Sequence, residues 1–159
     1  MPEHIVCAIP DDVSYEHAAF AEPVSIALHG VNRLPLQQGD SAVVVGAGLI
    51  GLLVIQALKA KGAGTLIAVD LDEKRLNLAK ELGADHALIS AEDVPAKVRE
   101  LVGNEDGADV SVEVVGFDPT INLAINSVRK GGSVSCVGNL KGHVSYTHLR
   151  AHETREYLV

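Results

Sequence analysis

Short apolar runs alternate with longer amphipathic stretches along most of the chain. Runs rich in Val, Ile, Leu and Ala, typical of buried strands, occupy residues 42–45, 65–69, 86–89, 110–115 and 133–137. Apolar residues recur at helical spacing over residues 22–34, 49–61, 72–82, 92–102 and 121–128. Strands that alternate with helices imply right-handed crossovers. The pattern therefore predicts an α/β fold, a doubly wound parallel Rossmann sheet with five strands present.

Proline and glycine residues divide this pattern into elements. Pro23 suits the first turn of the first predicted helix, and Pro35 is expected to end it. The pair at residues 131–132 is expected to stop the last helix. Residues 1–21, which are interrupted by prolines and aspartates, are expected to form a lead-in segment.

Charge and composition narrow the class of protein. The 159 residues suit one domain, and 47% are hydrophobic, which is enough for a packed core. The net charge of -8 disfavours binding to nucleic acid or to a membrane surface, because both are anionic. Two cysteines make no disulfide framework, and the N-terminus has no secretion-signal pattern, so we expect a cytoplasmic location.

A glycine motif follows the run at residues 42–45. Gly46, Gly48 and Gly51 form G-x-G-x-x-G between a predicted strand and a predicted helix. The first glycine permits a tight turn, the second lets a diphosphate approach the backbone, and the third lets the helix pack against the strand. The free N–H groups of the helix then attract phosphate. This context predicts dinucleotide binding.

An acidic residue completes the motif. Asp70 follows the second predicted strand, where a carboxylate accepts hydrogen bonds from the adenosine ribose. Because the carboxylate repels a 2′-phosphate, NAD is favoured over NADP, although the nearby Arg75 could accept such a phosphate. A Rossmann-like domain without a nucleotide, or one that binds S-adenosylmethionine, stays open as an alternative.

Several motifs together carry a family resemblance. They are AEPVS at 21–25, GAGLIG at 46–51, VDLD at 69–72, ELGAD at 81–85, VEVVG at 112–116, and GG at 131–132 before VG at 137–138. With these motifs the chain resembles the medium-chain zinc-dependent alcohol and polyol dehydrogenases, and most of all the sorbitol dehydrogenase group. The resemblance implies hydride transfer from a secondary alcohol of a polyol or sugar alcohol to NAD, with zinc as a second cofactor.

The resemblance also implies residue roles. The pyrophosphate site would comprise Gly48, Leu49, Ile50 and Gly51, and the ribose site Asp70 and Arg75. The residues near the nicotinamide would be Val114, Val115, Val137 and Gly138. Glu22 of the Glu-Pro motif would lie at the catalytic zinc, whereas from the sequence alone it suits a helix N-terminus. Small alcohols are the implied partners, and the intact parent is expected to be a homo-oligomer.

Other features of the family are missing. The N-terminal catalytic domain, which holds most of the zinc ligands, and the sixth strand are absent, so we expect no turnover, an open edge at residues 133–137 and impaired oligomerisation. His4, Cys7, His17 and His29 lack the spacing of a zinc site. We expect His29 to pack on its helix, and His4 and His17 to be solvated. The expected domains are a connecting segment with a helix at 1–34 and an NAD-binding domain at 35–143.

The last sixteen residues differ from the rest. Residues 144–154 resemble the translation of a transposase adapter used to build sequencing libraries, and residues 157–159 match its continuation. We therefore expect 144–159 to be a non-native tail. A natural C-terminal helix, in which His148 and His152 share one face, is the alternative.

Two other classes of protein remain open. One is a stand-alone dinucleotide-binding module without catalysis, and the other is a methyltransferase. A preceding domain with Cys and His-Glu zinc ligands would favour the enzyme, whereas a natural start at Met1 would favour the module. The Glu-Pro helix and the glycine pair at 131–132 argue against the methyltransferase.

Overall fold

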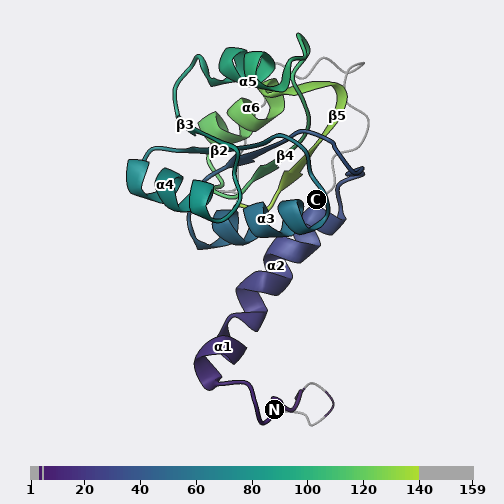
Figure 1. Ribbon diagram of the computed structural model, residues 1–159, viewed down its shortest axis with the longest axis vertical. Coiled ribbons are helices and arrows are strands. Elements are labelled where there is room, and N and C mark those ends of the chain that lie inside the picture. Colours follow the sequence, from purple (N-terminus) through teal and green to yellow (C-terminus); the bar gives the residue numbers. More distant parts are fainter. Residues whose placement is uncertain (1–3, 5, 140–159) are drawn as a thin grey trace.

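The computed structural model describes residue 4 and residues 6–139, and these form one parallel sheet with helices on both faces (Figure 1). The strands are β1 (Ala42–Val45), β2 (Leu66–Asp70), β3 (His86–Ile89), β4 (Ala108–Glu113) and β5 (Val128–Cys136). Their order is β3-β2-β1-β4-β5, and every neighbouring pair is parallel. The predicted doubly wound Rossmann sheet with five strands is confirmed.

Helices cover the two faces of this sheet. They are α1 (Tyr15–Ala19), α2 (Ala21–Asn32), α3 (Leu49–Ala60), α4 (Glu73–Glu81), α5 (Val94–Val102) and α6 (Asp118–Asn126). In Figure 1, α3 and α4 lie along one face, with the end of α2 beside α3, and α5 and α6 lie along the other. The central strand β1 is therefore enclosed from both sides, whereas the edge strands β3 and β5 are only partly buried.

The two-sided core explains why the strands are continuous apolar runs. Side chains alternate along β1, so that Val44 packs with Leu58 on the α3 side, while Val43 and Val45 pack with Val98 on the α5 side. All five of these side chains are fully or almost fully buried. Parallel strands covered on both faces need apolar residues at consecutive positions.

The last strand differs from its prediction. It begins at Val128, so Gly131 and Gly132 lie inside β5, and the interpretation of this pair as a helix stop was wrong. Gly131 has φ +74°, and the pairing of β5 with β4 shifts register after Ala108. A glycine in a strand commonly marks such an irregularity. Helix α6 has already ended at Asn126.

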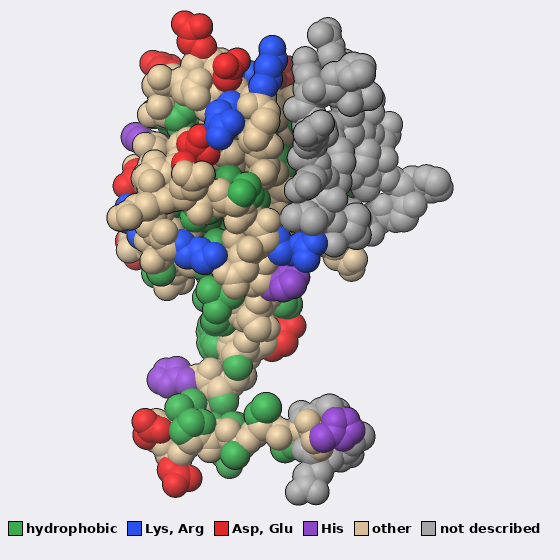
Figure 2. Space-filling model, turned by 90° about the vertical axis from the view of Figure 1, so that its right-hand side faces the viewer, with side chains coloured by type: hydrophobic (Ala, Val, Ile, Leu, Met, Phe, Trp, Pro, Cys, Tyr) green, Lys and Arg blue, Asp and Glu red, His purple; other side chains and the backbone are tan. Residues whose placement is uncertain are grey.

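The N-terminal residues form a projecting segment. Helix α1, where the Ser14 hydroxyl accepts a hydrogen bond from the His17 N–H (3.2 Å), leads directly into α2 (Figure 1). Figure 2 shows hydrophobic side chains along this projection, and Tyr15 and Phe20 are exposed there. His29 on α2 is also exposed, so its expected packing on the helix was wrong. His17 is exposed, as expected.

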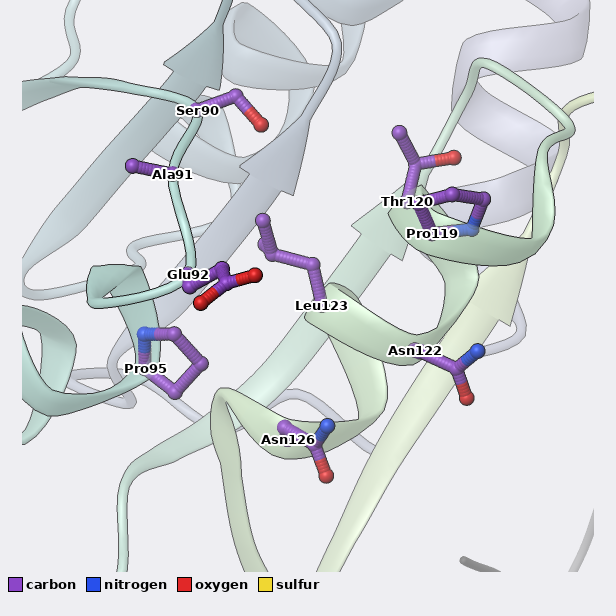
Figure 3. Close-up of a pocket in the computed structure, with 9 residues that line it drawn as sticks. All are labelled: Ser90, Ala91, Glu92, Pro95, Pro119, Thr120, Asn122, Leu123 and Asn126. Carbon is purple, nitrogen blue, oxygen red and sulfur yellow. The ribbon is translucent and has the colours of Figure 1, made fainter. Parts of the chain in front are cut away.

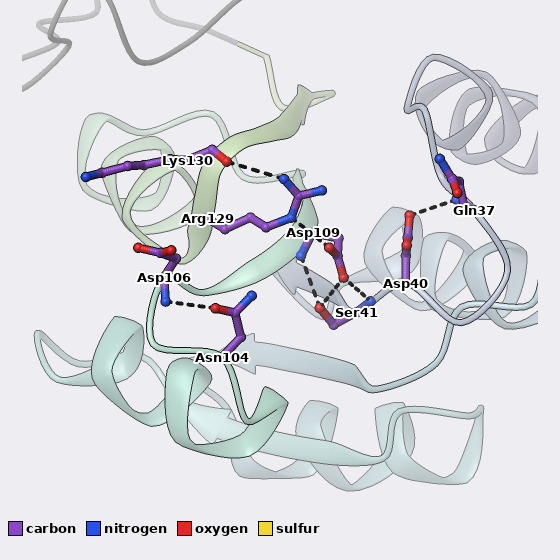
Figure 4. A network of polar contacts seen from close by, with 8 residues as sticks. All are labelled: Gln37, Asp40, Ser41, Asn104, Asp106, Asp109, Arg129 and Lys130. Carbon is purple, nitrogen blue, oxygen red and sulfur yellow. Dashed lines mark hydrogen bonds and ion pairs between the residues drawn. The ribbon is translucent and has the colours of Figure 1, made fainter.

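A polar network ties the strands together at the amino end of the sheet (Figure 4). Asp109 Oδ2 accepts hydrogen bonds from the Ser41 N–H (2.8 Å) and hydroxyl (2.7 Å), and Oδ1 accepts one from Arg129 Nε (2.8 Å). Partial burial raises the pKa of Asp109, but the Arg129 and Ser41 hydrogen bonds outweigh it, and the pKa lies below its ordinary value. The network links the lead into β1 with β4 and β5.

Candidate dinucleotide-binding site

The glycine motif forms the turn from β1 into α3. Gly46 has φ +101°, a conformation that favours glycine, and its N–H donates to the Val69 carbonyl of β2 (2.8 Å). Gly48 is the N-cap of α3, and its carbonyl accepts from the Leu52 N–H (2.9 Å). The N–H groups in the first turn of α3 have no carbonyl within the helix to bond. They therefore form an anion-binding terminus beside the turn.

The second and third glycines of the motif have opposite surroundings. A Cβ placed on Gly51 would run into the backbone carbonyl of Gly46, so this position must stay bare for the helix to approach the strand. A Cβ on Gly48 would meet no described atom within 4 Å. Because nothing in the described fold fills the space at Gly48, a ligand can come directly against its backbone.

Asp70 lies at the end of β2 and turns toward the glycine motif. Its Oδ2 accepts a hydrogen bond from the Ala47 N–H (2.7 Å), and its Oδ1 accepts one from the Asp72 N–H (2.9 Å). The side chain is only 9% exposed. An ionised carboxylate has about four lone-pair sites, so these two bonds leave acceptor capacity for ribose hydroxyls.

A cavity of about 280 Å³ opens beside this carboxylate. Its walls come from the carboxyl ends of β1, β2 and β3, from the first turns of α4 and α6, and from the segment between β4 and α6. The lining residues are Val45, Gly46, Val69, Asp70, Leu71, Asp72, Arg75, Ser90, Val115 and Thr120. The Arg75 guanidinium lies 3.9 Å from the Asp70 carboxylate and is 58% exposed. Ligands of open α/β sheets bind at this edge, where the strand order reverses.

The three valines that the resemblance places near the nicotinamide have separate positions. Val115 lines the same cavity as Asp70, whereas the Val114 side chain lies under the glycine turn, against Gly46 and Gly51. Val137 packs against Gly30 of α2. The nicotinamide role expected for these valines is not tested by this arrangement and stays a prediction.

A second cavity, of about 400 Å³, adjoins the first (Figure 3). It lies between the segment after β3 and helix α6, with Leu123 and Pro95 on its apolar sides, and Ser90 and Thr120 line both cavities. The open space beside Asp70 therefore continues toward α5 and α6.

The zinc ligand suggested by the resemblance stands apart from this cavity. Glu22 is exposed in the first turn of α2, where a carboxylate also suits the helix dipole. Among the described residues, no three His, Cys, Asp or Glu side chains come together as a metal site. A catalytic zinc takes about three protein ligands, so the described residues do not make a zinc site by themselves.

Six of the residues that line the Asp70 cavity were not singled out in the sequence, among them Leu71, Ser90 and Thr120. Leu71 and Ser90 directly follow β2 and β3, and Thr120 lies in the first turn of α6. The first two could have been found from the rule that ligands lie beyond the carboxyl ends of the strands. Thr120 comes from a neighbouring segment, whose position depends on how the chain folds.

Proteins of similar sequence and fold identify the family of this chain. Residues 50–156 match a family described as zinc-binding dehydrogenase, which is most of the chain. This chain belongs to the zinc-binding dehydrogenase family. The resemblance to the medium-chain zinc-dependent polyol dehydrogenases is thereby confirmed, since sorbitol dehydrogenase of Bacillus subtilis is 39% identical over 138 residues.

Solved dehydrogenase structures share the fold of this chain. The structure of 2R,3R-butanediol dehydrogenase from Bacillus subtilis superimposes with a TM-score of 0.77 at 40% identity, over 86% of this chain and 39% of that chain. A zinc-binding dehydrogenase from Sinorhizobium meliloti, solved with NADP bound, has a TM-score of 0.80 at 32% identity, over 87% of this chain and 42% of that chain.

The chain matches one part of these longer proteins. The match to sorbitol dehydrogenase covers 87% of this chain but 39% of the relative. The helices of the described residues lack the length and apolar character of a membrane crossing. The expected nature of residues 144–159 stays a prediction, because they lie outside the described residues.

Proposed function

We propose that this chain is the NAD-binding part of a zinc-dependent dehydrogenase that oxidises a secondary alcohol of a polyol or sugar alcohol. The observation that carries the proposal is the Ala47 N–H to Asp70 hydrogen bond (2.7 Å), which places a carboxylate beside the glycine turn and its cavity. The family and the sorbitol dehydrogenase relative support the reaction class. Bound NAD would supply the hydride acceptor.

The residues of the cavity have separate tasks in this proposal. The first-turn N–H groups of α3, at Leu49 and Ile50, attract the diphosphate above Gly48. Asp70 accepts hydrogen bonds from the adenosine ribose and repels a 2′-phosphate, so NAD binds better than NADP. Arg75 is within 3.9 Å of that carboxylate and partly offsets this repulsion.

The alcohol-binding side of the proposal extends past the described residues. Glu22 is the one residue of this chain that we assign to the zinc, with the remaining ligands in the further part of the longer protein. Because the described residues bring no three ligands together, we expect the chain by itself to show no turnover. The longer protein would act as a cytoplasmic homo-oligomer on small alcohols, without a nucleic-acid or membrane partner.

Titration with NADH tests the binding claim. NADH fluorescence should rise saturably on addition of the chain, and Asp70→Ala should weaken binding about tenfold or more, because a charge-assisted contact to ribose is lost. Asp85→Ala is the matched control. Asp85 accepts the Leu66 N–H (2.8 Å) at the opposite end of β2, away from the cavity. Folded chain with no saturable NADH signal would refute the proposal.

Turnover is tested separately. The chain is incubated with NAD, sorbitol and zinc, and NADH formation is followed by absorbance. We expect no formation above a reaction without protein. Turnover by the chain would show that a complete zinc site forms within it, contrary to the proposal.

A further inference from the structure

One carboxylate is fully buried at the carboxyl end of β4. Glu113 is 0% exposed, and its Oε1 accepts hydrogen bonds from the N–H groups of Val115 and Gly116, both at 2.8 Å. The Thr120 hydroxyl lies 2.7 Å from the same oxygen and 2.8 Å from the Phe117 carbonyl oxygen, so its proton serves one of the two at a time. A single oxygen thus accepts from donors in the segment between β4 and α6 and in the first turn of α6.

The second oxygen of this carboxylate faces the end of β5. Among the described residues Oε2 has no hydrogen-bond partner, and a Cβ on Gly138 would lie 2.8 Å from it. Burial raises the pKa of the Cys136 thiol on the neighbouring strand, and the nearby Glu113 carboxylate raises it further. Glu113 therefore touches two segments that leave the carboxyl edge of the sheet.

Burying a carboxylate in a protein core costs free energy unless hydrogen bonds compensate for the loss of its hydration. An apolar residue at this position would give a more stable core, because burying a charge without full compensation costs several kcal/mol. That cost is on the order of the free energy of unfolding of a domain. The compensation here is concentrated on Oε1, whose donors are Val115, Gly116 and Thr120. Two of these three residues line the Asp70 cavity.

We propose that Glu113 is a positioning residue for the dinucleotide, acting through the cavity wall opposite Asp70. Gly116 has φ +89°, a conformation that favours glycine, and its N–H donates to Oε1. Without this acceptor, the buried Gly116 N–H and the Val115 N–H lose their partner, and the wall rearranges to satisfy them. Glu113 itself does not line the cavity. This inference rests on the proposed NAD binding.

The test separates positioning from mere stabilisation. Dissociation constants for NADH and for ADP-ribose are measured with the wild-type chain, with Glu113→Ala and with Glu113→Gln, and urea curves give the stability of each. The expected loss for Glu113→Ala is about tenfold for both ligands, since both carry the adenosine that the wall contacts. Glu113→Gln keeps an acceptor at Oε1 and should stay within about threefold of wild type.

Asp109→Ala is the matched control. Asp109 lies on the same strand, accepts a backbone N–H and a hydroxyl as Glu113 does, and lies at the other end of the sheet. It should lower stability without changing either dissociation constant. If Glu113→Ala does not fold, the pair Thr120→Ser and Thr120→Val replaces it, with about threefold weaker binding expected for the valine variant alone.

Three results would overturn the inference. They are unchanged ligand affinity in Glu113→Ala, equal losses in Glu113→Gln and Glu113→Ala, or, where Glu113→Ala does not fold, equal affinity of the two Thr120 variants. Failure of the wild-type chain to bind NADH would instead refute the proposed function. The two failures are therefore distinguishable.

Discussion

Substituting alanine for each of two glycines in the motif separates the folding of the turn from its function. Gly48 has φ −75° and ψ −168°, an extended conformation open to alanine, and a Cβ there meets nothing described within 4 Å. Gly51 is enclosed, because a Cβ there meets the Gly46 carbonyl. We therefore expect Gly48→Ala to impair ligand binding alone and Gly51→Ala to impair stability as well.

The expected changes in the free energy of unfolding follow from helix capping, backbone entropy and packing at each glycine. For Gly48→Ala, the poorer N-cap costs about 0.5–1 kcal/mol, and the stiffer unfolded chain returns about 0.4–1 kcal/mol, so the net change in the free energy of unfolding is within about 1 kcal/mol. For Gly51→Ala, overpacking against backbone costs about 1–3 kcal/mol, and only about 1 kcal/mol of helix propensity offsets it.

The effect on binding is expected to be larger at Gly48. Its added methyl group occupies the path of the diphosphate and lengthens hydrogen bonds from the first turn of α3. Charge-assisted hydrogen bonds contribute about 1.5–3 kcal/mol each, so loss of one weakens NADH by about tenfold to a hundredfold. Urea unfolding followed by circular dichroism gives the stability, and NADH fluorescence gives the dissociation constant.

The two variants test separate claims, one about ligand binding and one about helix packing. A Gly48→Ala chain of wild-type stability that binds NADH as tightly as wild type would refute the placement of the diphosphate over this turn. A Gly51→Ala chain of unchanged stability would refute the close approach of α3 to β1.

Three further outcomes are expected. Because the folded-state pKa of Asp109 is depressed, the stabilisation by its carboxylate is present above the ordinary pKa of 3.8 and is lost as pH falls through the folded pKa. Asp109→Asn should therefore lower the free energy of unfolding in urea by about 1–2 kcal/mol at pH 7 and by much less near pH 3. An equal loss at both pH values would contradict this. Burial and the Glu113 carboxylate raise the pKa of Cys136, so a thiol reagent should modify the exposed Cys7 first and Cys136 in a slow phase, and equal rates would count against the packing of β5. Asp70→Ser should reduce the preference for NADH over NADPH in paired titrations, and an unchanged ratio would remove this carboxylate from cofactor selection.

Local pattern predicted two short strands and one helix at or close to their observed bounds. The strand at residues 86–89 and the strand at 42–45 were placed at their observed bounds, because short apolar runs next to turns leave little freedom. Helix α3 was placed within one residue, since glycines bound it at both ends. These signals act over neighbouring residues and can be read without knowing the fold.

Features that depend on distant residues could not be predicted in the same way. The early start of β5 reflects its pairing with β4, where Ala108 opposes Val128. His29 is exposed although Ala27, Gly30 and Val31 on the same helix are buried, so it lies on the uncovered face of α2. Helical periodicity says which residues share a face but not whether another element covers that face.

The glycine turn and the acidic residue of the candidate site could be predicted from the sequence, but the contacts that hold the side of the cavity formed by Val115 and Thr120 could not. Gly46 and Asp70 follow a spacing that the dinucleotide fold imposes, so their meeting could be expected. Glu113 is a charged residue within the apolar run at residues 110–115, and the glycine motif does not explain a charge at that position. Its partner Thr120 comes from the first turn of α6, which only the folded chain brings to Oε1.

A crystal structure of the chain with NADH tests the central claim most directly. The expected density has the diphosphate against the backbone of Gly48 and the first turn of α3, and the adenosine ribose hydroxyls within hydrogen-bond distance of the Asp70 carboxylate. NADH bound elsewhere on the chain, with the glycine turn and Asp70 free of ligand, would contradict it.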